Sequence, residues 1–186
     1  MQKLPVPLRV AIVGAESTGK STLAIALADA IAARSGLRCV AVPEVLREWC
    51  DREGRTPRID EQFGIAREQQ ARIDAAAATH DLVVCDTTPM MIAVYSVMLF
   101  NDESLLPFAI EQQRRCAITL LTAIDLPWVA DGLRDGPQVR EPVDARLRAL
   151  LDGHGIAWTR IAGQGAQRVD AALAAVTPLL TLLDRR

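Results

Sequence analysis

Short apolar runs alternate along the chain with longer stretches in which apolar residues recur at the three- and four-residue spacing of a helix. The apolar runs predict five strands, at residues 8–13, 37–42, 81–86, 116–121 and 156–161. The stretches between them predict helices at residues 21–34, 44–51, 60–78 (with Asp60 as N-cap), 89–99, 103–115, 143–152 and from 166 onward. Strands that alternate with helices form a parallel sheet covered on both faces. We therefore expect an α/β fold, a three-layer sandwich in which ligands bind at the carboxyl ends of the strands.

Residues 14–21 read Gly-Ala-Glu-Ser-Thr-Gly-Lys-Ser and lie between the first predicted strand and the first predicted helix. They fit the phosphate-binding loop (P-loop) of a glycine, four free positions and Gly-Lys-Ser, in the strand–loop–helix order that this loop requires. A chance match in an ordinary turn is the alternative. Lys20 is expected to reach the β- and γ-phosphates of ATP, and Ser21 to bind Mg²⁺. The expected nucleotide-binding residues of the loop are Gly14, Ser17, Thr18, Gly19, Lys20, Ser21 and Thr22. The three-layer sandwich is therefore expected to be of the P-loop NTPase type.

Two carboxylates directly follow predicted strands. Asp86 ends the third strand, where P-loop proteins hold a second Mg²⁺-directed carboxylate; alternatively it caps the next helix. Glu44 follows the second strand, and Arg47 lies one turn later on the same helix face. Because phosphoryl transfer needs a group that accepts or orients the substrate hydroxyl, we expect Glu44 in that role beside Arg47. An exposed ion pair worth only about 0.3–0.5 kcal/mol is the alternative.

The segment of residues 125–140 is rich in Asp, Gly, Pro and Arg and is expected to form a lid. Arg134 and Arg140 would then place guanidinium groups on the transferring phosphate, which can be worth roughly 10³–10⁵ in rate. A solvated arginine face is the alternative. Trp128 in this segment, and Trp49 before it, either stack on an aromatic ligand or belong to the core.

Two glycines, Gly163 and Gly165, follow the fifth predicted strand, with Arg168 behind them. This segment can pack against the adenine of ATP, and Arg168 is therefore a candidate nucleotide-binding residue. A simple strand-to-helix turn explains the glycines nearly as well.

Composition and charge narrow the class of protein. A chain of 186 residues with a net charge of −2 predicts one domain over residues 1–186, with no drive toward nucleic acid or an anionic membrane. The four cysteines lack metal-binding spacing and predict reduced thiols of a cytoplasmic protein. No apolar stretch reaches the roughly 18–20 residues that span a bilayer. The expected partner is a small molecule, and the sequence predicts no oligomeric state.

Five motifs recur in the order found in a known family. The chain resembles, from about residue 8 to 175, the nicotinamide riboside kinase domain of NadR-type proteins. The motifs are residues 14–21, Pro43-Glu44-x-x-Arg47-Glu48, Ile65-Ala66-x-x-Gln69, Cys85-Asp86-Thr87 and Pro127-Trp128-x-x-Asp131-Gly132-x-Arg134.

The resemblance implies transfer of the ATP γ-phosphoryl group to the 5′-hydroxyl of nicotinamide riboside, giving nicotinamide mononucleotide in NAD salvage. It implies ATP and Mg²⁺ as cofactors, with phosphate and metal bound by Lys20, Ser21 and Asp86, and Arg134 in the lid. The residues expected on the riboside side are Glu44, Arg47, Trp49, Gln69, Thr87, Trp128 and Asp131. The resemblance also implies a stand-alone kinase.

Three positions depart from residues common in that family: Val45 and Trp49, where tyrosine is frequent, and Thr88, where aspartate is frequent. All three lie on the riboside side and not in the P-loop. A kinase of another nucleoside or small metabolite is therefore one alternative. A regulatory P-loop ATPase that acts through a protein partner is another.

Overall fold

A computed structural model describes residues 7–129 and 136–184. Its parallel strands are β1 (Leu8–Val13), β2 (Cys39–Val42), β3 (Leu82–Asp86), β4 (Ile118–Thr122) and β5 (Trp158–Ile161). Its helices are α1 (Lys20–Ser35), α2 (Val45–Glu53), α3 (Ile59–Thr79), α4 (Pro89–Phe100), α5 (Leu106–Arg114), the 3-10 turn η1 (Pro137–Val139), α6 (Arg140–Gly153) and α7 (Ala166–Asp184).

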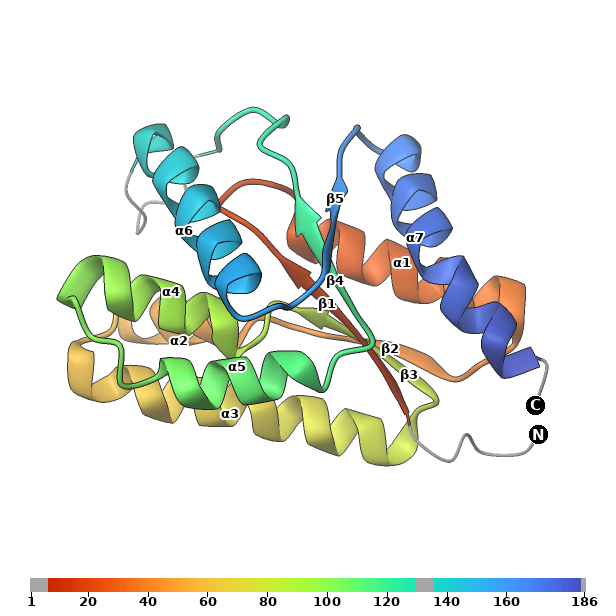
Figure 1. Cartoon of the computed structure of the whole chain (residues 1–186), viewed down its shortest axis with the longest axis horizontal. Coiled ribbons are helices and arrows are strands. Elements are labelled where there is room, and N and C mark those ends of the chain that lie inside the picture. Colours follow the sequence, from red (N-terminus) through yellow and green to blue (C-terminus); the bar gives the residue numbers. More distant parts are fainter. Residues whose placement is uncertain (1–6, 130–135, 185–186) are drawn as a thin grey trace.

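The five strands form one sheet in the order β2-β3-β1-β4-β5. Helices α1 and α7 cover one face of the sheet, and α3, α4, α5 and α6 cover the other (Figure 1). The predicted α/β sandwich of the P-loop NTPase type, with a five-stranded parallel sheet, is confirmed. Because β1 lies in the middle of the sheet, the P-loop that follows its carboxyl end lies between the two helical layers.

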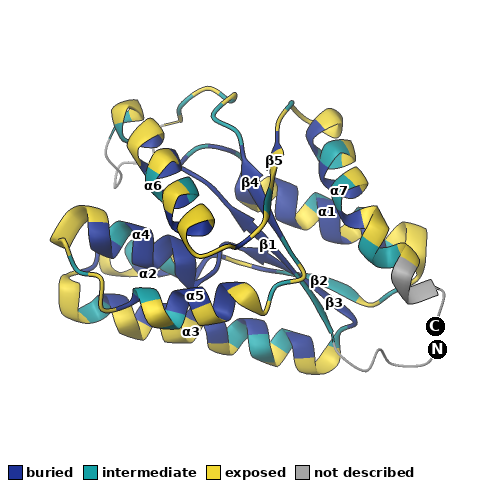
Figure 2. Ribbon diagram, viewed as in Figure 1, coloured by how far each residue is buried: buried dark blue, intermediate teal, exposed yellow. Residues whose placement is uncertain are grey.

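Alternation along the strands divides the core between the two faces. Val10 and Ile12 of β1 pack with α1 and α7, whereas Val13 packs with α4 and α6. On β3, Leu82 belongs to the first group, and the next residue, Val83, packs on α3. Side chains of a strand point alternately to opposite faces, so both faces are apolar, and the three central strands β3, β1 and β4 are largely buried (Figure 2).

Helix α3 begins before the residue predicted as its N-cap. Asp60 lies within the helix, and the N-cap is Arg58, whose backbone N–H donates to the Glu61 carboxylate at 2.7 Å. Arg55 also donates to Glu61 through two bonds of 2.8 and 2.7 Å. The prediction of Asp60 was wrong because the carboxylate of Glu61, three residues after the cap, reaches back to it.

Two other helices begin three residues away from their predicted starts at residues 103 and 143. Helix α5 begins at Leu106, because Asp102 accepts the Ser104 N–H at 3.0 Å and holds the preceding residues in a turn. Helix α6 begins at Arg140, so Arg140 belongs to a helix rather than to an irregular lid. Within the described part of the chain, every helix is too short or too polar to cross a membrane.

Candidate active site

The P-loop joins β1 to α1 with a backbone that only certain residues tolerate. Gly14 has φ of +149°, and a Cβ at this position would overlap the Thr122 hydroxyl oxygen at the end of β4. Gly19, with φ of +74°, is the N-cap of α1. Ser17 has φ of +53° and is held by its hydroxyl, which donates to the Val129 carbonyl at 3.0 Å. The two glycines of the motif are thus required by geometry.

Two side chains of the loop form hydrogen bonds to the backbone of the loop itself. Thr18 Oγ1 donates to the Ala15 carbonyl at 2.7 Å and lies 2.7 Å from Thr122 Oγ1. The buried Lys20 ammonium donates to the same Ala15 carbonyl at 2.8 Å, so its charge lies against the loop. Ser21 and Thr22, by contrast, present exposed hydroxyls in the first turn of α1. The first-turn amides and the helix dipole favour an anion at this end of α1.

Two arginines from the second half of the chain hold carbonyls of the P-loop. Arg140 donates to the Ser17 carbonyl at 3.3 Å, and its Nε is buried with no hydrogen-bond partner among the described residues. Arg168 donates to the Thr18 carbonyl at 3.0 Å and forms an ion pair with Asp125. Burial lowers the pKa of Arg168, and Asp125 opposes that shift. Both arginines therefore lie beside the loop, where their guanidinium groups bond to backbone carbonyls, and their role in nucleotide binding stays a prediction.

The carboxyl end of β3 lies next to the P-loop because β1 and β3 are neighbours, with Ile12 opposite Asp86. Asp86 is 4% exposed, and its Oδ1 has no hydrogen-bond partner in the part of the chain described. Thr87 follows with φ of +67° and donates its N–H to the Ile12 carbonyl at 3.1 Å. The unpartnered Asp86 carboxylate oxygen and the Ser21 hydroxyl oxygen can both serve as metal ligands. They fit a Mg²⁺ ion that also binds phosphate.

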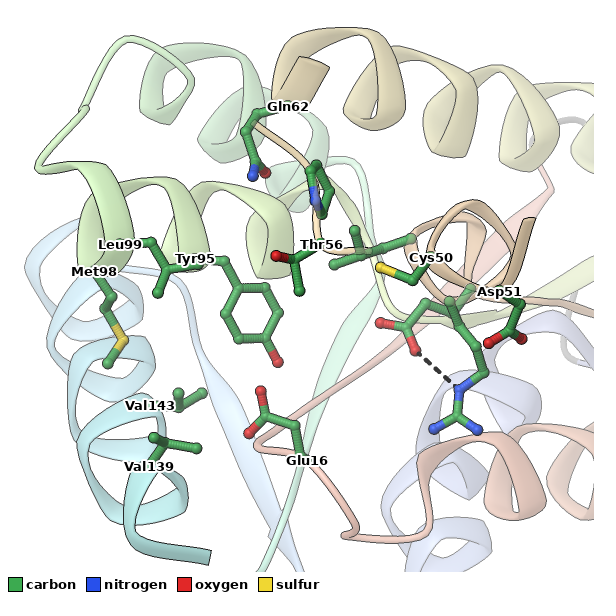
Figure 3. Close-up of a pocket in the computed structure, with 14 residues that line it drawn as sticks. Glu16, Cys50, Asp51, Thr56, Gln62, Tyr95, Met98, Leu99, Val139 and Val143 are labelled. Atoms are coloured by element: carbon green, nitrogen blue, oxygen red, sulfur yellow. Dashed lines mark ion pairs between the residues drawn. The ribbon is translucent and has the colours of Figure 1, made fainter. Parts of the chain in front are cut away.

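A cavity of about 540 Å³ lies beside the P-loop. The structure brings five segments together around it: the P-loop, α2 with the turn after it, α3, α4, and η1 with α6 (Figure 3). The lining residues are Glu16, Glu44, Leu46, Arg47, Cys50, Asp51, Thr56, Pro57, Gln62, Tyr95, Met98, Leu99, Val139 and Val143. This volume and its mixed lining are typical of small-molecule sites.

The charges on the cavity wall are mainly negative. Glu44, 8% exposed, is the N-cap of α2 and lies 3.9 Å from Arg47. Glu16 and Asp51 add two further carboxylates. Three carboxylates against one guanidinium among the described lining residues give a field that favours a cationic ligand.

Two residues predicted on the riboside side do not line the cavity. Gln69 is fully buried, where it accepts the Val45 N–H at 2.8 Å and donates to the Pro43 carbonyl at 3.2 Å. Trp49 is a residue of α2 whose side chain packs in the core. The Arg55 guanidinium lies 4.8 Å from the centre of the Trp49 ring. Gln69 fixes the turn that carries Glu44, and the Trp49 ring face is already occupied.

Glu44 and Arg47 line the cavity, whereas the other predicted residues either do not line it or lie outside the described chain. Thr87 is buried under the end of β3 and is not among the residues lining the cavity. Trp128 is half-buried in the loop after β4 and is likewise not a lining residue. Asp131 and Arg134 lie outside the described residues.

Glu16, Gln62 and Tyr95 are among the lining residues that sequence reasoning missed. Glu16 was treated as a free position of the P-loop motif, and Gln62 as one of many polar residues of a helix. Tyr95 is the only tyrosine of the chain and stands in an otherwise apolar helical stretch. A polar group in an apolar helix is a signal that could have identified Tyr95.

Residues 9–168 match the family model described as AAA domain, which covers most of the 186 residues. The chain belongs to this AAA domain family. A search of curated protein sequences found no match.

Solved structures share the fold of this AAA domain. NadR protein in complex with NAD and AMP-PNP has a TM-score of 0.69 and 19% identity over 91% of this chain. NadR protein in complex with NR has a TM-score of 0.74 and 18% identity over 93%. The chain spans 49% and 50% of these two NadR chains, about half their length. The NadR resemblance that the motifs indicated is confirmed at the level of the fold.

A further structure matches over its full length. The deoxyadenosine kinase from M. mycoides with bound dCTP has a TM-score of 0.58 and 12% identity, with 92% of this chain and 100% of the kinase covered. The AAA domain described here thus shares its fold with proteins solved in complex with NAD and AMP-PNP, with NR, and with dCTP.

Proposed function

We propose that the chain is an ATP-dependent kinase that phosphorylates a nucleoside, with the 5′-hydroxyl of nicotinamide riboside as acceptor. The observation that carries this proposal is the cavity of about 540 Å³ that begins at Glu16 of the P-loop and includes Glu44. A nucleoside bound there has its hydroxyl beside the position at which a P-loop holds the γ-phosphate. The fold shared with NadR in complex with NR supports this choice of acceptor.

In the proposed reaction, the loop amides and Lys20 bind the triphosphate. The 5′-oxygen of the acceptor forms a bond to the γ-phosphorus while the bond from that phosphorus to the β–γ bridging oxygen breaks, and ADP leaves. Glu44 accepts the proton of the 5′-hydroxyl. Mg²⁺, held by Ser21 and Asp86, would neutralise charge on the phosphates. We assign the same electrostatic role to Arg134 and Arg140.

The charge of the cavity supports a cationic acceptor. Nicotinamide riboside carries a pyridinium cation, and the cavity wall has three carboxylates and one guanidinium among its described residues. Attraction between them favours this riboside over a neutral nucleoside of similar size. We propose that Trp128 and Asp131 also contact the riboside.

The deciding experiment measures ADP release from Mg·ATP with and without nicotinamide riboside. We expect the riboside to accelerate ADP release, and nicotinamide mononucleotide to appear in equal amount. A panel of neutral nucleosides, including deoxyadenosine, tests the choice of acceptor. Acceleration by a neutral nucleoside alone would replace the substrate but keep the reaction type. Slow ADP release that no acceptor accelerates would indicate a regulatory ATPase and overturn the proposal.

Glu44→Gln tests the assigned base. We expect turnover to fall by about 10²–10⁴-fold, because the amide cannot take the proton, while ATP affinity stays the same. Glu48→Gln is the matched control, since Glu48 lies on the same helix but pairs with Arg72 at 2.5 Å on the exposed side. Unchanged turnover in Glu44→Gln would remove this residue from the mechanism.

A further inference from the structure

Two buried oxygen atoms that belong to cavity-lining residues lack hydrogen-bond partners among the described residues. These atoms are Glu16 Oε2 and Gln62 Oε1. The two residues are 5% and 3% exposed, so bulk water scarcely reaches them. Buried polar atoms are nearly always hydrogen-bonded, and such an atom in a binding cavity is best explained by a ligand that supplies the missing donor.

The two residues lie at opposite ends of the cavity. Figure 3 shows Glu16 beneath the hydroxyl end of Tyr95, and Gln62 on the far side of the Tyr95 ring with its amide directed into the space. Glu16 belongs to the P-loop, so its end of the cavity is the phosphate end. Gln62 lies in the first turns of α3, so its end is remote from the phosphates.

Met98 and Leu99 of α4, with the Tyr95 ring, line the wall between these two ends. A ligand that satisfies both ends therefore has a hydroxyl at the Glu16 end, a ring in the space between, and an N–H group at the Gln62 end. The ring of the ligand would lie along the Tyr95 side of the cavity, between the two acceptor oxygens.

We propose that Glu16 and Gln62 determine acceptor specificity: Glu16 accepts a hydrogen bond from the 2′- or 3′-hydroxyl of the sugar, and Gln62 pairs with a primary carboxamide on the base. This inference rests on the proposed kinase function. A carboxamide donates N–H to Gln62 Oε1 and accepts from the Gln62 amide nitrogen. A carboxylate in the same place has no donor, and it adds a fourth negative charge to a cavity that already holds Glu16, Glu44 and Asp51.

The first test compares nicotinamide riboside with its carboxylate analogue, nicotinic acid riboside. We expect the wild-type kcat/KM to favour the amide by about tenfold to a hundredfold. Gln62→Leu should lower kcat/KM for the amide by about tenfold or more and leave the acid nearly unchanged. Gln62→Glu retains an acceptor oxygen and should still favour the amide over the acid.

Gln70→Leu is the matched control for Gln62→Leu. Gln70 is also a buried glutamine of α3, but its amide donates to Asp74 at 3.1 Å and does not line the cavity. We expect the amide-to-acid ratio of this variant to equal that of the wild type. An equal change of the ratio in both variants would mean that Gln62 acts through the helix and not on the ligand.

The second test concerns Glu16. Glu16→Ala should lower kcat/KM for the riboside by about tenfold or more, and for its 2′,3′-dideoxy analogue by less than about twofold, because that analogue lacks the hydroxyls. Equal losses for both acceptors would overturn the role of Glu16. Failure of the wild type to phosphorylate any acceptor would overturn the kinase proposal itself. Phosphorylation with unchanged ratios in every variant would overturn only the specificity inference.

Discussion

Gln69 is expected to stabilise the fold and the catalytic turn through a single amide. Its Oε1 accepts the Val45 N–H at 2.8 Å, and its Nε2 donates to the Pro43 carbonyl at 3.2 Å. Val45 is the first residue of α2 and is buried, so no helical carbonyl and little water can replace this acceptor. The amide therefore fixes both residues that flank Glu44.

Gln69→Leu keeps the side-chain volume roughly constant and removes both bonds. The unpaired Val45 N–H costs about 1–3 kcal/mol, and the lost bond to Pro43 about 0.5–1.5 kcal/mol. We therefore expect the free energy of unfolding to fall by about 1.5–4.5 kcal/mol in urea titrations. Because the Glu44 turn loosens, kcat should also fall while ATP affinity is retained.

Gln70→Leu serves as the control here too, since it removes one side-chain bond from the same helix. We expect it to lower the free energy of unfolding by only about 0.5–1.5 kcal/mol, with kcat unchanged. If Gln69→Leu were no less stable than this control, the amide would not hold the turn. If stability fell as expected but kcat did not, the turn would not position Glu44.

Three further predictions concern the P-loop and the start of α3. Lys20→Ala should lower turnover by about 10³-fold or more with an unchanged circular-dichroism spectrum; retained turnover would refute its phosphate role. Gly14→Ala should abolish nucleotide binding in a titration, because the new Cβ overlaps Thr122; normal affinity would refute this geometry. Bonds from Arg55 lower the pKa of Glu61 to about 2, so its contribution to stability is present above about pH 4.5 and is lost as pH falls toward 2. Urea midpoints of Glu61→Gln should therefore fall less with acid than those of the wild type, and parallel curves would contradict this.

The strands and the P-loop could be predicted because each is encoded by neighbouring residues. The apolar run of residues 8–13 and the glycines at 14 and 19 need no distant partner to be recognised. The predicted starts of helices were wrong where a side chain forms a contact that the spacing of apolar residues does not reveal. Glu61 reaches back to Arg58 and moves the start of α3, and the turn at Asp102 delays α5.

The cavity was less predictable because it is assembled from segments far apart in sequence. Gln62 and Gln69 are seven residues apart on α3, so both occupy the buried face of that helix. Only the tertiary structure distinguishes them, since Gln69 bonds to the turn before α2 and Gln62 faces the cavity. A buried glutamine at a core position of a helix therefore predicts a polar contact but does not identify the partner.

The central place of β1 in the sheet bears on how the chain matures during synthesis. One edge of β1 pairs with β3, and the other pairs with β4 from Val10 opposite Ile118 onward. One edge of β1 can thus pair once β3 has been synthesised, whereas the other edge stays unpaired until β4 has been synthesised. The Thr18 carbonyl acquires its hydrogen bond later still, because the donor is Arg168. A nascent chain should accordingly not acquire nucleotide binding before the segment that carries Arg168 has been synthesised.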